Sequence, residues 1–183
     1  MSENIIVMHC APTLAGIKTG NLFSISLTAT KLYLDDIRKL NSVLTEKGIR
    51  MVPLKVREQS VLIYVYRPSS LQEDLNDKEV ILLLKRMGYP VSSPEQCVAY
   101  LAKRLKEKDD FPHEIGLFLG YPLEDVMGFI ENKAQNYKCI GTWKVYGDEV
   151  AAQKRFVKYR KCTEDYCERT KRGESIGNLA VAL

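Results

Sequence analysis

The residues best suited to chemistry lie in three short stretches of the chain, and the first runs from His9 to Asn21. Within it, Pro12 and Gly16 bracket a single predicted helical turn, which would leave Cys10 just before a helix N-terminus. Free amides and the helix dipole stabilise a thiolate or a bound anion at that position. The stretch therefore favours either a reactive thiol or anion site, or a plain turn with a buried thiol and a surface lysine.

The second stretch covers residues 111–130 and contains an adjacent imidazole and carboxylate, His113 and Glu114. These two side chains have the chemistry of a base or a ligand, and Cys10 with His113 would make a thiol–imidazole pair if the fold brings them together. The alternative is a local structural hydrogen bond. The same stretch has the spacing of a helix-turn-helix, but Glu124 and Asp125 would repel phosphates. A packed helical corner is the favoured interpretation.

The third stretch joins Trp143 and Lys144 to a basic helix in which cations alternate with aromatic residues. The cations are Lys154, Arg155, Lys158, Arg160 and Lys161, and the aromatic residues are Phe156 and Tyr159. Such a composition is typical of a surface that grips a nucleic-acid backbone. It is equally typical of the solvated face of an amphipathic helix, and this second interpretation is the one favoured here.

Composition excludes several classes of protein. The net charge of +4 on 183 residues is only weakly basic and does not indicate nucleic acid as a partner. Five scattered cysteines and two histidines disfavour a disulfide scaffold or a structural zinc site. No apolar run reaches the roughly 20 residues of a membrane helix, and no secretion signal is visible. We therefore expect a cytoplasmic protein without membrane insertion.

These stretches must be positioned by a single α+β domain spanning residues 1–183, with a flexible tail at 173–183. A hairpin over residues 51–67, with strands near 22–27 and 139–146, is expected to form a small, mainly antiparallel sheet. Five or six helices should pack with it. The predicted helical segments are 30–47, 71–87, 94–108, a broken pair within 112–133, and 148–170.

Three segments carry a resemblance to a known family: HCAPTLAGIKTGNLF, FPHEIGLFLGYPLEDVMGFI and YKCIGTWKVYGDEVAAQKRF. There the chain resembles uncharacterised proteins of similar length from anaerobic, Clostridia-type bacteria, grouped as a domain of unknown function. The Pro-His-Glu-Ile-Gly run at residues 112–116 looks like the signature of that family. The resemblance implies a single-domain, bacterial cytosolic protein, and it implies no activity, cofactor or catalytic residue.

The leading functional hypothesis is a cytosolic module that binds a small molecule or a protein without catalysis. Its pocket would combine residues of all three stretches, namely His9, Cys10, Thr13, Lys18, Asn21, His113, Glu114, Trp143 and Lys144. One alternative is a thiol or redox enzyme that uses Cys10 as nucleophile and His113 as base. Another is a nucleic-acid-associated protein acting through the C-terminal helix. The sequence identifies no cofactor, and no metal site is expected.

Overall fold

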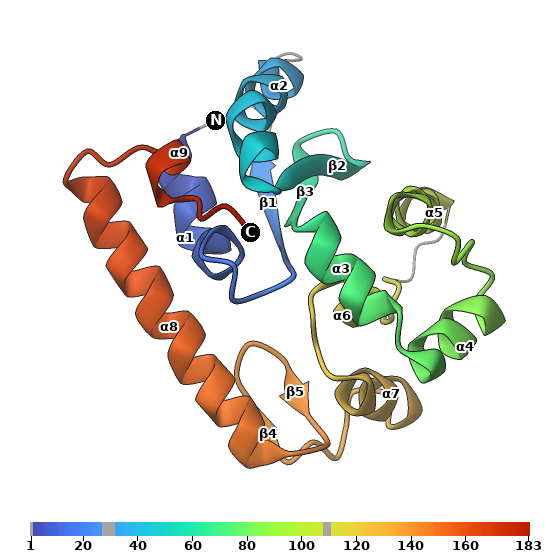
Figure 1. The fold of residues 1–183 in the computed structure, drawn as a ribbon. Helices are drawn as coiled ribbons and strands as arrows, with labels where there is room; N and C mark the ends of the chain where they lie inside the picture. Colours follow the sequence, from blue (N-terminus) through green and yellow to red (C-terminus); the bar gives the residue numbers. More distant parts are fainter. Residues whose placement is uncertain (1, 27–31, 108–110) are drawn as a thin grey trace.

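The computed structural model describes residues 2–26, 32–107 and 111–183 (Figure 1). In these residues the elements are α1 (Glu3–Leu14), β1 (Gly20–Ser26), α2 (Leu32–Leu44), the 3₁₀ helix η1 (Thr45–Lys47), β2 (Arg50–Val56), β3 (Ser60–Tyr66), α3 (Pro68–Leu75), α4 (Lys78–Arg86), α5 (Pro94–Glu107), α6 (Ile115–Phe118), α7 (Leu123–Glu131), β4 (Cys139–Ile140), β5 (Lys144–Val145), α8 (Glu149–Lys171) and α9 (Ile176–Leu179). The chain forms one α+β domain, as predicted. The described part has more helices than the five or six expected.

Three strands form an antiparallel sheet in the order β1-β3-β2. The hairpin predicted for residues 51–67 is confirmed as β2 and β3, and the amide of Arg57 donates to the carbonyl of Ser60 across its turn (2.7 Å). Pro53, which lacks an amide hydrogen, lies in β2 at the edge of the sheet, where a register shift follows it. β1 pairs with the other side of β3 and confirms the strand predicted near 22–27, although residue 27 lies outside the described residues.

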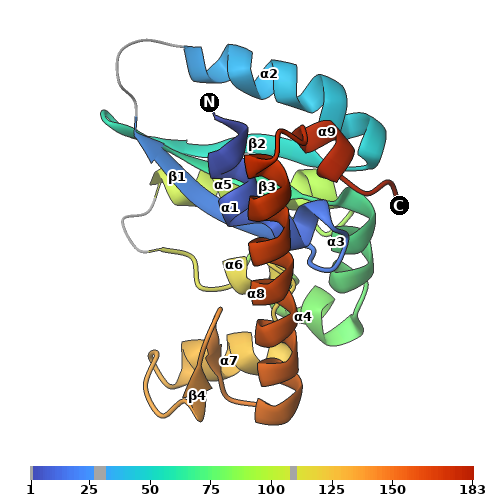
Figure 2. The ribbon, with the colours of Figure 1, turned by 90° about the vertical axis from the view of Figure 1, so that its left-hand side faces the viewer.

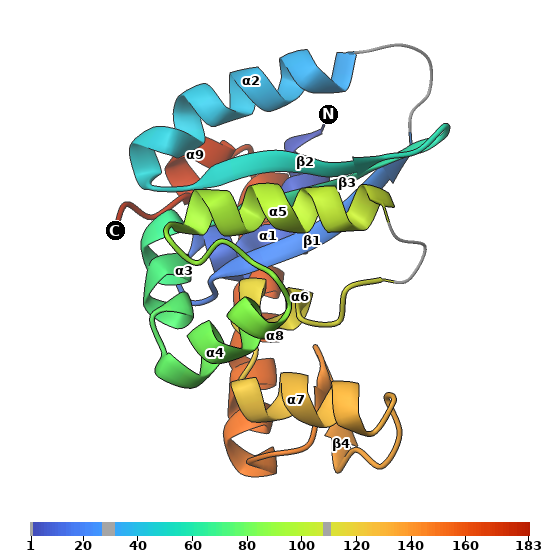
Figure 3. The same cartoon turned by 90° about the vertical axis from the view of Figure 1, so that its right-hand side faces the viewer.

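Both faces of the sheet are covered, because successive side chains of β3 point to opposite sides. Val61, Ile63 and Val65 belong to a core shared with α1, α2, α9 and the end of α8. Tyr64 and Tyr66 belong to a second core with α3, α4, α5 and α6. Figure 2 shows α1 and α8 in front of the sheet, and Figure 3 shows α5 lying across its other face. The domain therefore has three layers.

A third, smaller core lies at one end of the molecule, where the first part of α8 meets the short β4–β5 hairpin (Figure 1). Trp143 and Val145 of the hairpin pack there against Ala152 and Tyr159 of α8. The sequence predicts a strand of the main sheet at residues 139–146. That prediction is wrong, because β4 and β5 pair only with each other.

The N-terminal stretch differs most from expectation. The predicted single turn between Pro12 and Gly16 is instead the end of α1, which contains Pro12 within it, and Gly16 follows the helix with a φ of 71°. The helix packs on the sheet and against α8, and its exposed side also carries the apolar residues Ile5 and Met8. An apolar helix of this kind lacks the one-sided stripe by which sequence periodicity reveals helices. Cys10 consequently lies inside a helix and not before its N-terminus.

Two further segments depart from their predicted form. The helix predicted over residues 71–87 is divided into α3 and α4, since the side chain of Asp77 caps α4 by accepting from the amides of Glu79 (2.8 Å) and Val80 (3.2 Å). The end of the chain, predicted as a flexible tail from 173 to 183, instead forms α9, which buries Ile176 and Leu179 in the first core.

The remaining predicted helices are present with small changes of extent. The segment 30–47 is α2 followed by η1, and it stops at Gly48 with a φ of 70°. Residues 30 and 31, and residue 108 at the end of α5, lie outside the described residues. The segment 148–170 is α8, and α6 and α7 are the pair expected within 112–133. In the described ranges no helix has the length and apolarity needed to cross a membrane.

Candidate functional site

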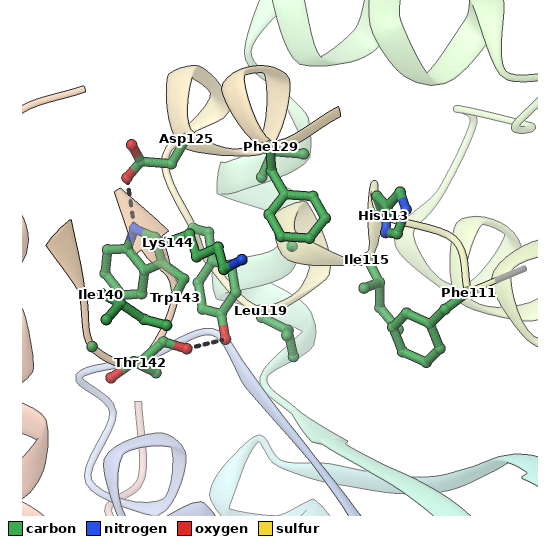
Figure 4. Close-up of a pocket in the computed structure, with 14 residues that line it drawn as sticks. Phe111, His113, Ile115, Leu119, Asp125, Phe129, Ile140, Thr142, Trp143 and Lys144 are labelled. Atoms are coloured by element: carbon green, nitrogen blue, oxygen red, sulfur yellow. Dashed lines mark hydrogen bonds between the residues drawn. The ribbon is translucent and has the colours of Figure 1, made fainter. Parts of the chain in front are cut away.

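An apolar cavity, the hairpin cavity, lies between α7 and the β4–β5 hairpin (Figure 4). Its volume is about 320 Å³, within the range typical of small-molecule sites. Most of its lining is aromatic or aliphatic. The lining residues are Phe111, His113, Ile115, Gly116, Leu119, Tyr121, Asp125, Val126, Phe129, Ile140, Gly141, Thr142, Trp143 and Lys144.

Trp143 is the centre of the aromatic wall. It is the only tryptophan of the chain and is 7% exposed. The ring of Tyr121 stacks on it with centroids 4.7 Å apart, and Phe156 of α8 packs edge-on at 4.5 Å. These contacts anchor the hairpin between α7 and α8, so the wall of the cavity is held in place from both sides.

A buried carboxylate, Asp125, ties the hairpin to α7. Its Oδ2 accepts from the indole Nε1 of Trp143 (2.6 Å), and its Oδ1 accepts from the amides of Tyr146 (2.7 Å) and Gly147 (2.8 Å). Asp125 lies in the first turn of α7, where the helix dipole favours a negative charge. The close approach of the residues after β5 to α7 also requires Gly128, because a Cβ at this position of α7 would collide with the ring of Tyr146. These contacts agree with the packed helical corner favoured for this stretch.

Two cationic or ionisable nitrogen groups, His113 and Lys144, lie on the lining of this cavity (Figure 4). The imidazole of His113 is exposed, packs edge-on against Phe129 at 4.9 Å, and has no hydrogen bond to any described residue. Lys144 Nζ donates to the carbonyl of Ala134 (2.8 Å) and lies 4.7 Å from the ring centroid of Tyr137. No described carboxylate forms an ion pair with either group, so the cavity combines an aromatic body with uncompensated positive charge.

The loop that carries Ala134 is strained. Lys133, Ala134 and Asn136 all have positive φ values of 49°, 63° and 57°. Residues other than glycine rarely adopt this conformation, and it persists where the surrounding structure requires it. Here the strain places the Ala134 carbonyl against the Lys144 ammonium, which holds that ammonium at the side of the cavity.

Three predicted site residues, His9, Lys18 and Asn21, line a different cavity of about 300 Å³. This space lies between the end of α1 and the middle of α8 and is called the α1–α8 cavity. Its other lining residues are Pro12, Thr142, Phe156, Tyr159, Arg160, Thr163 and Glu164. Thr142 lines both cavities, so the predicted pocket is divided at the tip of the β4–β5 hairpin, with His113, Trp143 and Lys144 on the other side.

Thr13, Cys10 and Glu114 line neither cavity. The hydroxyl of Thr13 is buried and donates to Asn21 Oδ1 (2.7 Å). Glu114 is 2% exposed, pairs with Arg104 (3.0 Å between Oε1 and Nε) and accepts from the hydroxyl of Tyr89 (2.7 Å). These contacts give Glu114 a structural role. The local hydrogen bond expected as the alternative for the His113 imidazole is not formed with any described residue.

Cys10 is fully buried in the first core, and burial raises the pKa of its thiol well above the ordinary value. A raised pKa disfavours the thiolate, the form that acts as nucleophile. His113 lines the hairpin cavity, which Cys10 does not reach. The structure thus supplies no support for the thiol–imidazole pair.

Cys10 is therefore expected to resist alkylation in the folded protein. Iodoacetamide at pH 8 should modify the half-buried Cys139, Cys162 and Cys167 first. Cys10 should react at least about 100-fold more slowly than in the urea-unfolded chain, because the thiol is reached only on opening. Peptide mapping of timed samples measures both rates. Rapid native alkylation of Cys10 that slows in His113→Ala would contradict this expectation and favour the thiol enzyme.

The basic side of α8 borders a third cavity of about 370 Å³, the α3–α8 cavity, lined by Arg155 and Lys158 among others. Glu73 and Asp74 of α3 line the same space. Carboxylates beside these cations weaken attraction for a nucleic-acid backbone. The described residues contain no group of three or more histidine, cysteine, aspartate or glutamate side chains arranged to hold a metal ion.

Sequence reasoning missed Asp125, Tyr121 and Phe129 as site residues. The local signal for Asp125 was its position in the first turn of α7, which was used only as evidence about groove charge. Tyr121 and Phe129 lack any such signal, because aromatic residues at helical spacing most often indicate core. Their role follows from the long-range placement of the hairpin.

Comparison with known proteins identifies one family model, described as a protein of unknown function (DUF3793), which matches residues 6–180. Nothing among the curated proteins and nothing among the solved structures matches the chain.

Proposed function

Because the chain belongs to this family of proteins of unknown function, we propose its function from the hairpin cavity: it binds a small aromatic carboxylate without transforming it. The proposed compartment is the cytoplasm of a bacterium, which the free state of all five cysteines supports. No cofactor is part of the proposal.

The observation that carries the proposal is the pairing of an aromatic cavity with a lysine ammonium and an imidazole, neither of which forms an ion pair with a described carboxylate. Phe129 and Trp143 offer ring faces for a flat apolar body. His113 and Lys144 offer hydrogen-bond donors to an anionic group. Asp125 does not repel such a ligand strongly, since both of its oxygens are engaged by donors from the hairpin.

Titration with 2-naphthoate tests the proposal. Because Trp143 is the only tryptophan, the ¹⁵N-labelled protein has one indole resonance, and that resonance lies in the cavity wall. We expect it to shift saturably. The neutral analogue 2-naphthamide should bind at least about fivefold more weakly, because it lacks the charge that Lys144 and His113 complement.

Matched variants separate the contribution of the aromatic lining to binding from that of the lysine charge. Phe129→Ala should weaken both ligands, whereas Lys144→Met should weaken 2-naphthoate selectively and bring it close to 2-naphthamide. Lys154→Met, which removes a cation from the exposed side of α8, should leave both affinities unchanged. The proposal fails if the indole resonance does not move at millimolar 2-naphthoate, or if the two ligands bind equally well.

A further inference from the structure

Lys18 is a buried cation without a counter-charge. The residue is 6% exposed, and its ammonium donates to the carbonyl of Gly20, a neutral acceptor. The ring centroid of Tyr121 lies 5.3 Å from Nζ. No described carboxylate forms an ion pair with it. Burying a lysine in this way is costly unless the amine becomes neutral.

Burial lowers the pKa of Lys18 to about 7, and the nearby Cys10 acts in the opposite direction. At neutral pH about half of the Lys18 amines are therefore unprotonated, whereas an exposed lysine with a pKa near 10.4 is almost entirely protonated. A neutral amine is a nucleophile, and desolvated lysines of this kind form imines with carbonyl compounds.

Although it is buried, Lys18 lines both the α1–α8 cavity and the α3–α8 cavity, so a small molecule that enters either space contacts this residue. In the α1–α8 cavity it shares the lining with Asn21 and Arg160. The Oδ1 of Asn21 accepts a hydrogen bond from the hydroxyl of Thr13. The NH₂ group of Asn21 donates to no described residue. Arg160 forms no ion pair with any described carboxylate, although Glu164 also lines this space.

We propose that Lys18 is the reactive amine of a second site, where it forms an imine with the aldehyde or keto group of a small oxo acid held by Arg160. This site lies in the α1–α8 cavity and is separate from the hairpin cavity. Its ligand class combines a carbonyl carbon for the amine with a carboxylate for the guanidinium.

The chemistry balances without a redox partner. The lone pair of Nζ attacks the carbonyl carbon, the C=O π bond opens, and the oxygen takes up a proton while nitrogen loses one. The Asn21 NH₂ group is available to donate to the oxygen of this carbinolamine. The carbinolamine hydroxyl then takes up a second proton and leaves as water as the C–O bond breaks; the nitrogen lone pair forms the C=N bond, and the nitrogen releases its remaining proton. Hydrolysis reverses the sequence, so the site captures its ligand reversibly.

Several ionisable groups lie near Lys18. They are His9 and Cys10 of α1, Glu73 and Asp74 of α3, Tyr121, and Arg155, Lys158, Tyr159, Arg160 and Glu164 of α8. Cys10 and Tyr121 have raised pKa values because they are buried, and that of Tyr121 rises to about 12, so both stay neutral near pH 7. Neither of these two groups therefore produces the change in labelling rate expected near pH 7.

Reductive trapping tests the proposal on the full chain. Glyoxylate with sodium cyanoborohydride at pH 7 converts an imine into a stable secondary amine, which peptide mass mapping locates. We expect Lys18 to be labelled at least about tenfold faster than the exposed Lys154 and Lys161, since its neutral fraction is larger by a factor on the order of 10³. Its labelling rate should rise with pH to about 7 and then level off, while that of exposed lysines keeps rising.

Two controls assign the effect. The Lys18→Arg variant keeps a cation at this position but cannot form an imine, so the fast labelling should disappear. In the unmutated protein, propionaldehyde lacks a carboxylate and should label Lys18 at least about fivefold more slowly than glyoxylate. Labelling spread over exposed lysines with Lys18 untouched at pH 7 would overturn the proposal. Equal rates for glyoxylate and propionaldehyde would overturn the oxo-acid class.

Discussion

Replacement of Arg67 by methionine is expected to lower the free energy of unfolding by at least about 3 kcal/mol. Arg67 is 0% exposed and donates four hydrogen bonds to main-chain carbonyls of three separate segments. Its Nε donates to Thr13 (2.7 Å), its Nη1 to Lys47 (3.0 Å), and its Nη2 to Leu14 (2.8 Å) and Val181 (2.7 Å). Methionine fills similar space but leaves all four carbonyls without these donors.

The charge of Arg67 is compensated by main-chain dipoles. Thr13 and Leu14 are the last residues of α1, where the carbonyls carry the negative end of the helix dipole. The carbonyl of Thr13 also accepts from the amide of Gly16 (3.1 Å), and that of Leu14 from the amide of Val181 (3.0 Å). Each of these hydrogen bonds involves a charged donor and is stronger than a neutral one. Arg67 therefore joins the end of α1, the end of η1 and the segment after α9, and its loss should loosen all three.

Urea unfolding followed by circular dichroism measures this effect. Arg67→Lys should also be destabilising, because one ammonium cannot reproduce the geometry of the planar guanidinium. Arg57→Met provides the matched control: Arg57 is exposed at the β2–β3 turn, and its replacement should change stability by less than about 0.5 kcal/mol. A loss below about 1 kcal/mol in Arg67→Met would show that water or neighbouring groups satisfy the carbonyls equally well.

The example of Arg67 shows why part of the fold could not be predicted from the sequence. An arginine directly after an apolar strand is ordinarily a surface residue, and nothing nearby in the chain indicates that carbonyls from residues 13, 14, 47 and 181 surround it. The C-terminal segment was misjudged for the same reason. Its helix α9 is short, and its burial depends on α1 and α2.

The elements that were predicted correctly are those with complete local signals. The β2–β3 hairpin combines β-branched and aromatic residues with a short polar turn, and α5 begins with Ser93 followed by Pro94 at its first position. For α1, periodicity was uninformative because its exposed side also carries apolar residues, Ile5 and Met8. For residues 71–87, the cap at Asp77 was available in the sequence but was outweighed by the continuous apolar spacing around it.

Most of the residues predicted to form one pocket line two cavities in the structure. His113, Trp143 and Lys144 do share a cavity, and so do His9, Lys18 and Asn21. Whether the two groups meet depends on where the β4–β5 hairpin lies relative to α8. That placement rests on contacts of Asp125 with residues about 20 positions away along the chain, which no local pattern encodes.

Replacement of Asp125 by alanine is consequently the second change expected to have a large effect. It removes acceptors from the Trp143 indole and from the amides of Tyr146 and Gly147, and buried donors left unpaired cost about 1–3 kcal/mol each. We expect a loss of stability of about 2–4 kcal/mol, a red shift of tryptophan emission as the hairpin loosens, and loss of 2-naphthoate binding. Asp125→Asn should be intermediate, because its amide keeps one acceptor and adds a misplaced donor.

Asp148→Ala is the matched control for Asp125→Ala. Asp148 follows the hairpin directly but caps α8, where its carboxylate accepts from the amide of Ala151 (3.0 Å). Loss of this cap should cost about 1 kcal/mol and leave the tryptophan emission and the affinity for 2-naphthoate unchanged. If Asp125→Ala kept the emission and the binding of the unmutated protein, the hairpin would be held by the packing of Trp143 against Tyr121 and Phe156 alone. Asp125 would then neither position the hairpin nor shape the cavity beside it.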